Sequence, residues 1–366
     1  MNRTLSLLAV VCGLAIQMAG AAYAAEPMVL AYYSGYPNNY ASLTAHYQHF
    51  NAASIDYYNI TSKGAVVGNG DPAPIEAIDF LRRKKIPAYG CVSNVKNGEW
   101  SPTVAHAVMT TALDSAVASL VSFAQTRQFA GINVDFEAVD QSDRANFSHF
   151  VQVLGNALHA QGLKLIVSVP AFSAIDAQHP YNKAFDLHAL GLGADYLQVM
   201  TYDEAIPGWD PGPVSGSDWV EDDLDYAVSQ VPPAKLLSGL QAYGYDWRAD
   251  NSGSQLYWVD TPALTDQYHV TPKYDVATNS VHFSYQPNDG TGAHTVWTEN
   301  KRSVTMKAGL VNAYGLGGTS VYALGMEDER YWAAVDAGLA SRSPVRAGFG
   351  RSARPKVSGS VDVGHQ

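Results

Sequence analysis

The sequence predicts an α/β fold, a (β/α)8 barrel of the TIM type with a small β-rich insertion between its seventh and eighth strands. Eight short runs of apolar, β-branched or aromatic residues recur along the chain, with helix-like stretches between them. Such alternation is typical of a parallel sheet, and eight units in one chain favour closure into a barrel. With 366 residues, 47% of them hydrophobic, the chain is long enough to bury the core of this fold.

The predicted barrel strands follow one another from the N-terminal third of the chain to its end. They span residues 28–33, 54–60, 86–92, 131–136, 163–169, 194–200, 236–243 and 318–324. The clearest helices are predicted over 104–126 and 144–161. In a barrel of this kind the functional groups gather where the strands end, at the C-terminal face.

One interval interrupts this rhythm, from roughly residue 248 to residue 298, between the seventh strand and the helix before the eighth. It contains Gly, Asn and Asp turns and short strand-like runs, the clearest over residues 281–285. We interpret this interval as a small β-rich lobe of the barrel domain, too polar to form a core of its own.

The two ends of the chain differ from the predicted barrel domain, which spans residues 25–340. Residues 1–24 resemble a secretory signal, with Arg3, an apolar run over 5–18 and a small-x-small site ending at Ala24. The run is too short to span a membrane stably, so cleavage near Ala24 predicts a secreted or periplasmic protein. From 341 to 366 the chain is rich in Ser, Gly, Pro and Arg, which predicts a disordered basic tail. A tether to an anionic envelope polymer is the alternative.

Composition excludes several classes of protein. The formal net charge of −11 argues against nucleic acid as a partner. Cleavage of the signal leaves Cys91 as the single cysteine, so an internal disulfide is ruled out. We interpret Cys91 as a buried strand residue rather than a nucleophile. His46 and His49, three residues apart, are only a weak metal signal. The motifs of zinc proteases, serine hydrolases, P-loops and dinucleotide sites are missing from the sequence, so we predict no cofactor and no metal.

The polar residues that indicate a functional site lie at the end of the fourth strand, in the segment GINVDFE over residues 131–137. Side chains alternate across a strand, so Asn133, Asp135 and Glu137 share one face, which in a barrel is the interior. Three polar groups in a row on a buried face are costly unless they bond one another or a ligand. Glu137 comes last, at the rim. The alternative is a surface strand with ordinary charges.

This segment resembles the D-G-x-D-x-D-x-E signature of family 18 glycoside hydrolases, the chitinase-type barrels. Residues 198–203, 235–244 and 315–324 resemble that family's sixth, seventh and eighth strands, in the expected order. The likeness is greater still to bacterial spore-cortex-lytic N-acetylglucosaminidases of this family. Their Gly-Tyr-Asp-Trp, Val-Trp and Leu-Gly-x-Glu-Asp segments are similar to residues 244–247, 296–297 and 324–328.

The sequence departs from the family's pattern at three positions. Ala130 stands at the signature's first Asp, and Asn133 stands at its second, which in the family is a hydrogen-bond partner below the catalytic pair. Asn keeps the bonding but drops the charge, so we expect a weaker upward push on the pKa values of Asp135 and Glu137 and an altered pH profile. Tyr322 stands where many chitinases place a Trp under the scissile sugar, which points away from chitin.

The resemblance implies a mechanism in which the substrate's own N-acetyl group takes part. Glu137 would act as general acid and then as base, and Asp135 would hold and polarise the acetamide. Tyr202 would donate a hydrogen bond to the acetamide carbonyl, and Asp203 would contact the sugar or Glu137. A retained β-anomer and an oxazoline-like intermediate are the consequences.

Further residues are expected to bind the substrate. Aromatic side chains at strand ends are candidates for stacking on sugars, and we favour Trp247 and Trp297 because they lie in family-like segments; Tyr33, Trp100 and Trp209 are weaker candidates. The complete set of expected binding residues is Tyr32, Asn133, Gln198, Met200, Trp247, Trp297 and Tyr322.

The sequence therefore predicts an exported, retaining glycosidase whose partner is an N-acetylglucosamine-containing polysaccharide, with peptidoglycan preferred. A chitinase or an endo-β-N-acetylglucosaminidase is the first alternative. A catalytically silent lectin on the same barrel is the second, although such lectins typically lack the catalytic Glu that Glu137 supplies here. No oligomeric state follows from the sequence.

Overall fold

The computed structural model of the protein describes residues 26–70 and 72–341. The predicted signal peptide over 1–24 and, apart from Ser341, the predicted basic tail lie outside the described residues.

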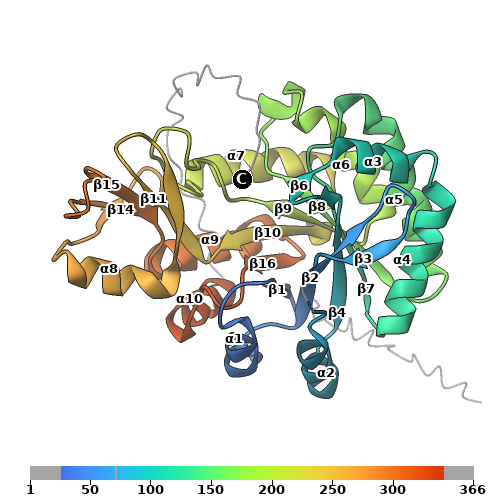
Figure 1. The fold of residues 1–366 in the computed structure, drawn as a ribbon, viewed down its shortest axis with the longest axis horizontal. Coiled ribbons are helices and arrows are strands. Elements are labelled where there is room, and N and C mark those ends of the chain that lie inside the picture. The colour runs from blue at the N-terminus through green and yellow to red at the C-terminus, as the bar shows by residue number, and fades with distance from the viewer. Residues whose placement is uncertain (1–25, 71, 342–366) are drawn as a thin grey trace, which may run out of the picture.

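Within residues 26–70 and 72–341, eight parallel strands form a closed barrel, as predicted (Figure 1). Their order around the barrel is β1, β16, β10, β9, β8, β7, β4, β2, and the pairing of β1 with β2 closes the ring. The strands are β1 (Met28–Tyr33), β2 (Ala52–Ile60), β4 (Ala88–Ser93), β7 (Gly131–Asp135), β8 (Lys164–Pro170), β9 (Tyr196–Met200), β10 (Leu236–Gln241) and β16 (Gly318–Tyr322). Each of them overlaps one of the runs expected from the sequence.

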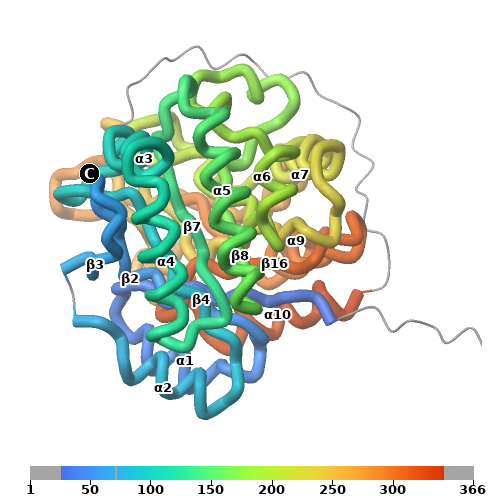
Figure 2. The backbone as a smooth tube through the Cα atoms, turned by 90° about the vertical axis from the view of Figure 1, so that its right-hand side faces the viewer, coloured from blue at the N-terminus to red at the C-terminus, as the bar shows by residue number. Residues whose placement is uncertain are grey.

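Helices surround the barrel and cover the outer faces of its strands (Figure 2). They are α1 (Asn39–His46), α2 (Ile75–Lys84), α3 (Pro102–Met109), α4 (Leu113–Arg127), α5 (Arg144–His159), α6 (Leu187–Gly193), α7 (Ser217–Gln230), α9 (Lys301–Tyr314) and α10 (Glu329–Ala340). Two short hairpin elements lie beside the barrel rim, β3 (Val66–Gly68) against β2 and β5 (Val95–Lys96) against β6 (Glu99–Trp100).

The single helix predicted over 104–126 is wrong, because the chain forms two helices, α3 and α4, that meet at 94°. Thr110 ends α3: its hydroxyl turns back to the carbonyl of His106 at 2.6 Å, and Thr111 follows with a second β-branched side chain. Among the helices of the described segments, none is by itself long and apolar enough to cross a membrane, although this bent pair passes that test when its members are taken together.

Apolar and polar side chains alternate in the fourth barrel strand, β7, and the apolar ones pack against the helix layer as expected. Ile132 and Val134 are fully buried, and the ring of Phe136 stacks on Phe147 and Phe150 of α5 at 6.2 and 5.7 Å between centroids. Gly131 begins the strand where β7 and β8 approach closely, since a Cβ there would lie 1.9 Å from the carbonyl oxygen of Lys164. The polar residues of β7 are thereby directed to the barrel interior.

The insertion folds as an antiparallel sheet beside the barrel, with strand order β12-β11-β15-β14-β13 in the described chain (Figure 1). Its elements are β11 (Tyr243–Trp247), β12 (Gly253–Tyr257), α8 (Thr261–Gln267), β13 (Lys273–Asp275), β14 (Ser280–Tyr285) and β15 (His294–Thr298). The sheet begins at Tyr243, earlier than the expected residue 248, because β10 ends at Gln241 and the chain turns directly into β11. We refer to residues 243–298 as the inserted lobe.

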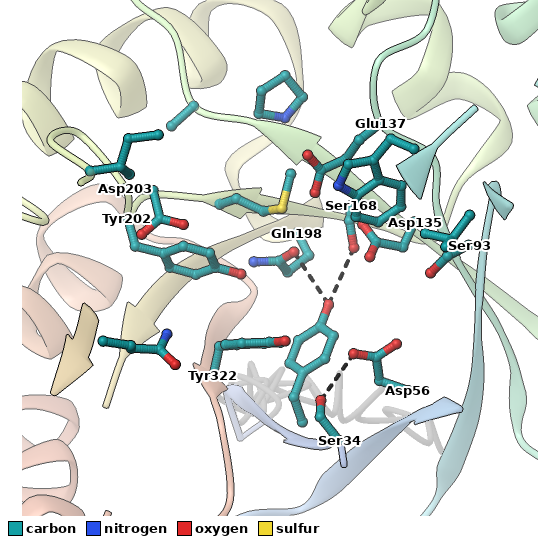
Figure 3. Close-up of a pocket in the computed structure, with 18 of the residues that line it drawn as sticks. Ser34, Asp56, Ser93, Asp135, Glu137, Ser168, Gln198, Tyr202, Asp203 and Tyr322 are labelled. Atoms are coloured by element: carbon teal, nitrogen blue, oxygen red, sulfur yellow. Dashed lines mark hydrogen bonds between the residues drawn. The ribbon is translucent and has the colours of Figure 1, made fainter. Parts of the chain in front are cut away.

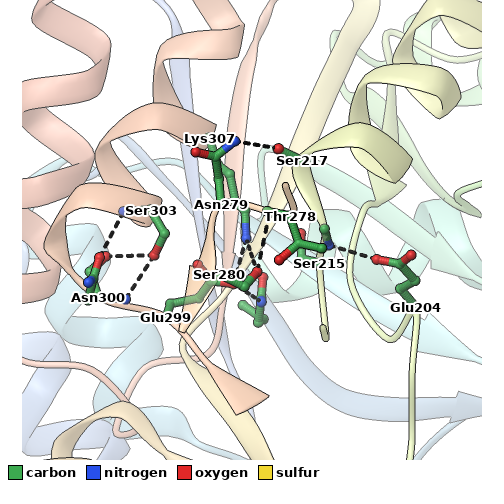
Figure 4. A network of polar contacts seen from close by, with 12 residues as sticks. Glu204, Ser215, Ser217, Thr278, Asn279, Ser280, Glu299, Asn300, Ser303 and Lys307 are labelled. Carbon is green, nitrogen blue, oxygen red and sulfur yellow. Dashed lines mark hydrogen bonds and ion pairs between the residues drawn. The ribbon is translucent and has the colours of Figure 1, made fainter. Parts of the chain in front are cut away.

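A buried ion pair and its neighbours join the inserted lobe to the barrel (Figure 4). Lys307 of α9 lies 2.5 Å from Glu299, which follows β15, and both side chains are nearly inaccessible to solvent. Glu299 also accepts a hydrogen bond from Gln241 at the end of β10. Asn279 of the lobe donates to Ser217, the first residue of α7, at 2.7 Å. The lobe is therefore fixed to the barrel through polar contacts.

Candidate active site

A cavity of about 1260 Å³ opens at the C-terminal ends of the barrel strands (Figure 3). The side chains around it come from β1, β2, β4, β7, β8, β9 and β16, from the loops that follow them and from the inserted lobe. They include Tyr32, Asp56, Trp100, Asp135, Glu137, Ser168, Tyr181, Gln198, Met200, Tyr202, Asp203, Trp209, Trp219, Tyr243, Tyr245 and Tyr322.

Glu137 is held at the end of β7 through its backbone. The side chain of Asn94, which is fully buried, accepts a hydrogen bond from the Glu137 N–H at 3.0 Å and donates one to the Glu137 carbonyl at 2.8 Å. This reciprocal pair fixes the backbone of Glu137 while its carboxylate points into the cavity (Figure 3). The carboxylate is thus preorganised toward whatever occupies the cavity.

A neutral donor lies beside the Glu137 carboxylate. The hydroxyl of Tyr181, on the loop after β8, donates to Glu137 Oε2 at 3.0 Å. Burial raises the pKa of Glu137 to about 7, and the negative charges of Asp203 and Asp56 push in the same direction, while the Tyr181 hydrogen bond opposes them. A carboxyl with this pKa carries a proton through the acidic range and can still lose it near neutrality.

Asp135 lies next to Glu137 and is half-buried. Burial raises its pKa well above the usual range, and the nearby charges of Glu137 and Asp56 add to this effect. Among the described residues, none makes a hydrogen bond to its buried Oδ1. A buried acceptor without a partner is costly, so this atom is matched to a donor that a ligand would bring.

The floor of the cavity is a hydrogen-bond network centred on Tyr32 of β1. Its hydroxyl accepts from Asn133 at 2.9 Å and lies 3.2 Å from the Ser168 hydroxyl and 3.3 Å from Gln198 Oε1. Asn133 also donates to Ser54 at 3.0 Å, and its amide oxygen accepts from Ser168. Asn133 therefore both donates and accepts hydrogen bonds below the carboxylates. An amide can do this because it carries both donors and an acceptor.

On the opposite side of the cavity lie Tyr202 and Asp203, directly after β9. Burial raises the pKa of the Tyr202 hydroxyl well above its usual range, so it remains a protonated donor. Asp203 has a positive φ of 67° and accepts hydrogen bonds from Tyr243 at 2.7 Å and Tyr245 at 2.9 Å, both in the inserted lobe. The lobe therefore orients an acidic group of the cavity.

Most of the residues expected from the sequence do meet in the cavity. Asp135, Glu137, Tyr202, Asp203, Tyr32, Gln198, Met200 and Tyr322 are among the lining residues, and Asn133 lies directly beneath them. Tyr322 packs against Tyr32 and Tyr202, with ring centroids 5.5 and 6.1 Å away, and its hydroxyl lies 3.3 Å from that of Tyr36.

The two favoured stacking residues, Trp247 and Trp297, lie elsewhere. Trp247 is completely buried and donates its indole N–H to the carbonyl of Ile206, so its faces are unavailable to a sugar. Trp297 stacks on His282 of the neighbouring strand at 4.7 Å, outside the cavity lining. Both belong to the packing of the inserted lobe. The weaker candidates Trp100 and Trp209 do line the cavity, and Trp209 is 42% exposed.

Sequence reasoning missed several lining residues, among them Asp56, Tyr181 and Trp219. Asp56 lies on β2 and accepts from Ser34 at 2.9 Å, and its alternation with the buried Ser54 on the same strand was a usable signal. Tyr181 and Trp219 carry no such signal, because a loop and a helix start bring them to the rim.

The comparisons with known proteins place this site in a family. The sequence model described as glycosyl hydrolases family 18 matches residues 28–327, so the chain belongs to this family. It is a glycosidase on a chitinase-like TIM barrel.

Individual relatives refine this picture. The chain is 66% identical to a chitinase from Chromobacterium violaceum ATCC 12472, whose crystal structure matches with a TM-score of 0.85 over 86% of this chain and 100% of that one. It is 34% identical to the "Uncharacterized glycosylase YvbX" of Bacillus subtilis (strain 168), over 86% of this chain and 92% of the relative. It is 28% identical to the cortical fragment-lytic enzyme of Bacillus cereus, over 66% of this chain and 57% of that enzyme's length.

Proposed function

We propose that this protein is an exported, retaining glycoside hydrolase that cleaves β-linked N-acetylglucosamine polymers by substrate-assisted catalysis. The observation that carries the proposal is the buried Oδ1 of Asp135, which has no partner among the described residues, beside a Glu137 whose pKa is raised to about 7. An acetamide N–H is the donor that this acceptor needs, and the glycosidic oxygen is the base that a protonated Glu137 needs.

The first step uses Glu137 as an acid. Its proton passes to the glycosidic oxygen while the acetamide carbonyl oxygen of the substrate attacks the anomeric carbon, and the bond from that carbon to the leaving sugar breaks. Asp135 accepts a hydrogen bond from the acetamide N–H and stabilises the positive charge of the oxazoline-like intermediate. The Tyr202 hydroxyl donates to the carbonyl oxygen and orients it. Proton transfer of this kind typically contributes ~10²–10⁴ in rate.

The second step uses Glu137 as a base. Water gives one proton to the Glu137 carboxylate and attacks the anomeric carbon, while the bond between that carbon and the acetamide oxygen breaks and the oxazoline ring opens. Glu137 is thereby protonated again. Two displacements at one carbon retain the β-configuration. Asp203, held by Tyr243 and Tyr245, keeps a negative charge near Glu137 and so supports its protonated form.

Peptidoglycan glycan strands are the polymer that we favour. A relative with 28% identity is a cortical fragment-lytic enzyme, and Tyr322 replaces the Trp expected in many chitinases. Chitin is the second candidate, favoured by the 66% identity to a chitinase. Both polymers supply the N-acetyl group that the mechanism needs.

Product analysis by mass spectrometry tests the proposal. Protein and its Glu137→Gln variant are incubated separately with purified peptidoglycan, with chitin oligomers and with cellulose-type oligomers. We expect muropeptides with N-acetylglucosamine at the new reducing end, no product from the variant and no product from unsubstituted glucans. Chitobiose from chitin alone assigns the second candidate, cleavage of cellulose-type oligomers contradicts substrate assistance, and binding without products indicates a lectin.

Export depends on the segment 1–24, which lies outside the described residues. We propose a secreted or periplasmic location from its signal-like sequence. Expression of the natural gene product and N-terminal sequencing of the exported protein test this, and a mature N-terminus at Ala25 is expected.

A further inference from the structure

A cluster of histidine and carboxylate side chains lies on the outside of the barrel, between α1 and α10. His46 is the last residue of α1, His49 follows three residues later, and Glu329 is the first residue of α10. Nδ1 of His46 and Nε2 of His49 each lie 3.4 Å from Oε2 of the same Glu329 carboxylate. All three atoms lie within 4.8 Å of one another. None of these residues lines the cavity.

The spacing of these atoms fits the edges of a metal coordination tetrahedron. With metal–nitrogen and metal–oxygen bonds of about 2.0–2.1 Å, ligand atoms in a tetrahedral zinc site are separated by roughly 3.3 Å. Two of the three edges, from Glu329 to each imidazole, already have this length within about 0.1 Å. The third edge joins the two imidazole nitrogens, and only a small rotation of side chains is needed to bring it to this length. The Glu329 side chain is 69% exposed and can adjust to that rotation.

The second nitrogen of His49 is held as metal-binding imidazoles usually are. Oδ2 of Asp336, two turns further along α10, lies 2.7 Å from Nδ1 of His49. A ligating histidine typically donates its other N–H to a carboxylate, which fixes the tautomer and strengthens the ligand. The ring of His49 also stacks on Trp332, at 5.9 Å and 15° between planes. These contacts direct the Nε2 lone pair of His49 toward Glu329.

His46 supplies an independent observation. Its Nδ1 is buried, and no hydrogen bond reaches it from any part of the chain that the structure describes. Glu329 is near enough, but the two groups are not aligned as donor and acceptor. A buried nitrogen without a partner is costly, and a cation placed between His46, His49 and Glu329 would satisfy it.

We propose that His46, His49 and Glu329 form a binding site for a divalent transition-metal ion of the zinc type, with Asp336 positioning His49. Two imidazoles and a carboxylate suit Zn²⁺ among the common divalent ions, and a water molecule completes the fourth position. The ion's charge balances the two carboxylates. This site is separate from the proposed hydrolytic site and has no role in its chemistry.

The position of the site suggests what the ion does. α1 follows the first barrel strand and α10 follows the last, and these two strands, β1 and β16, pair along a seam between the first and last units of the barrel (Figure 1). Glu327 already connects the two helices, since its carboxylate accepts from Ser42 of α1 and from Trp332 of α10. A metal ion would add a second connection across this seam and stabilise the folded state by mass action.

Calorimetric titration of untagged, chelator-treated protein with ZnCl₂ tests the proposal. We expect one ion bound per chain and a rise in the thermal unfolding temperature on its addition. Glu329→Gln and His49→Ala should abolish this binding, and Asp336→Asn should weaken it ~10–100-fold, as loss of such a carboxylate usually does. His149→Ala, which removes an exposed histidine from α5, is the matched control and should bind as the unchanged protein does.

The Glu329→Gln variant guards against a folding artefact, because its exposed side chain contributes little to packing. Its unfolding temperature without metal should equal that of the unchanged protein. The proposal fails if Zn²⁺ does not bind with a stoichiometry of one, or if Glu329→Gln binds it as tightly as the unchanged protein. In either case the cluster is a set of ion pairs and nothing more.

Discussion

Burial raises the pKa of Glu137, and the hydroxyl of a neighbouring tyrosine opposes that rise. Tyr181 donates to its carboxylate at 3.0 Å, and a hydrogen bond to the ionised form favours ionisation. The two negative charges that oppose it, on Asp203 and Asp56, come from other strands. Asp56 thus supplies, from β2, a like charge near the pair although Asn133 carries none. Asn133 was expected to leave the pKa values of Asp135 and Glu137 less strongly raised, and the charge of Asp56 offsets part of this effect.

Tyr181→Phe is predicted to shift the pH dependence of hydrolysis toward alkaline pH. The substitution removes the donor, so the pKa of Glu137 should rise above about 7. A general acid must be protonated, and its pKa sets the alkaline limb of kcat/KM in the free enzyme. Tyr226→Phe, on α7 and outside the cavity lining, is the control and should leave the profile unchanged. An alkaline limb that stays in place in Tyr181→Phe would show that the hydroxyl does not tune Glu137.

Glu137→Gln is predicted to change stability in a pH-dependent way. The folded-state pKa of Glu137 is about 7, against an ordinary value of 4.5, so the unfolded chain ionises first as pH rises. The unchanged protein therefore loses stability relative to the variant between pH 4.5 and about 7, and the difference is constant below and above that window. Urea unfolding of both proteins across this range measures it. A difference that does not vary with pH would refute the raised pKa.

At the scale of elements, the barrel strands could be predicted from the sequence, but the burial of the aromatic residues in the inserted lobe could not. Period-two alternation in 131–137 correctly directed Asn133 and Glu137 inward and Phe136 outward, because a strand leaves its side chains only two directions. Trp247 also lies in a strand, β11, but that strand is paired on both sides within the lobe's sheet, and the indole is fully buried. Burial of that kind depends on tertiary packing, which no local pattern encodes.

Substitution of a buried tryptophan and of an exposed one should have different effects on stability and on substrate binding. Trp247→Ala should destabilise the protein by about 3–5 kcal/mol, as removal of a large buried aromatic side chain does. Trp209→Ala, at an exposed position on the cavity rim, should leave stability nearly unchanged and raise KM for long glycans. Urea unfolding and steady-state kinetics on both variants check this. The reverse pattern would make Trp247 a binding residue and the cavity assignment wrong.

At the scale of the whole molecule, the inserted lobe and the barrel share one active-site cavity. Tyr243 and Tyr245 of the lobe bond Asp203 of the barrel, and residues from both parts line the same space. The family-like motifs revealed the barrel half of this cavity. The loop that carries Tyr181 and the sheet that presents Tyr245 could not be placed from sequence, because their positions depend on contacts between segments far apart in the chain.

The buried pair of Lys307 and Glu299 should therefore matter for both stability and activity. Lys307→Met leaves the Glu299 carboxylate buried without its cation, which typically costs about 3–5 kcal/mol. Glu299 follows β15 and Gln241 precedes β11, so the loss loosens the lobe where it meets the barrel, and hydrolysis should fail at lower urea than it does in the unchanged protein. Lys273→Met, at an exposed lobe position, is the control and should change stability by less than about 0.5 kcal/mol. If Lys307→Met is as stable and active as this control, the ion pair does not hold the lobe in place.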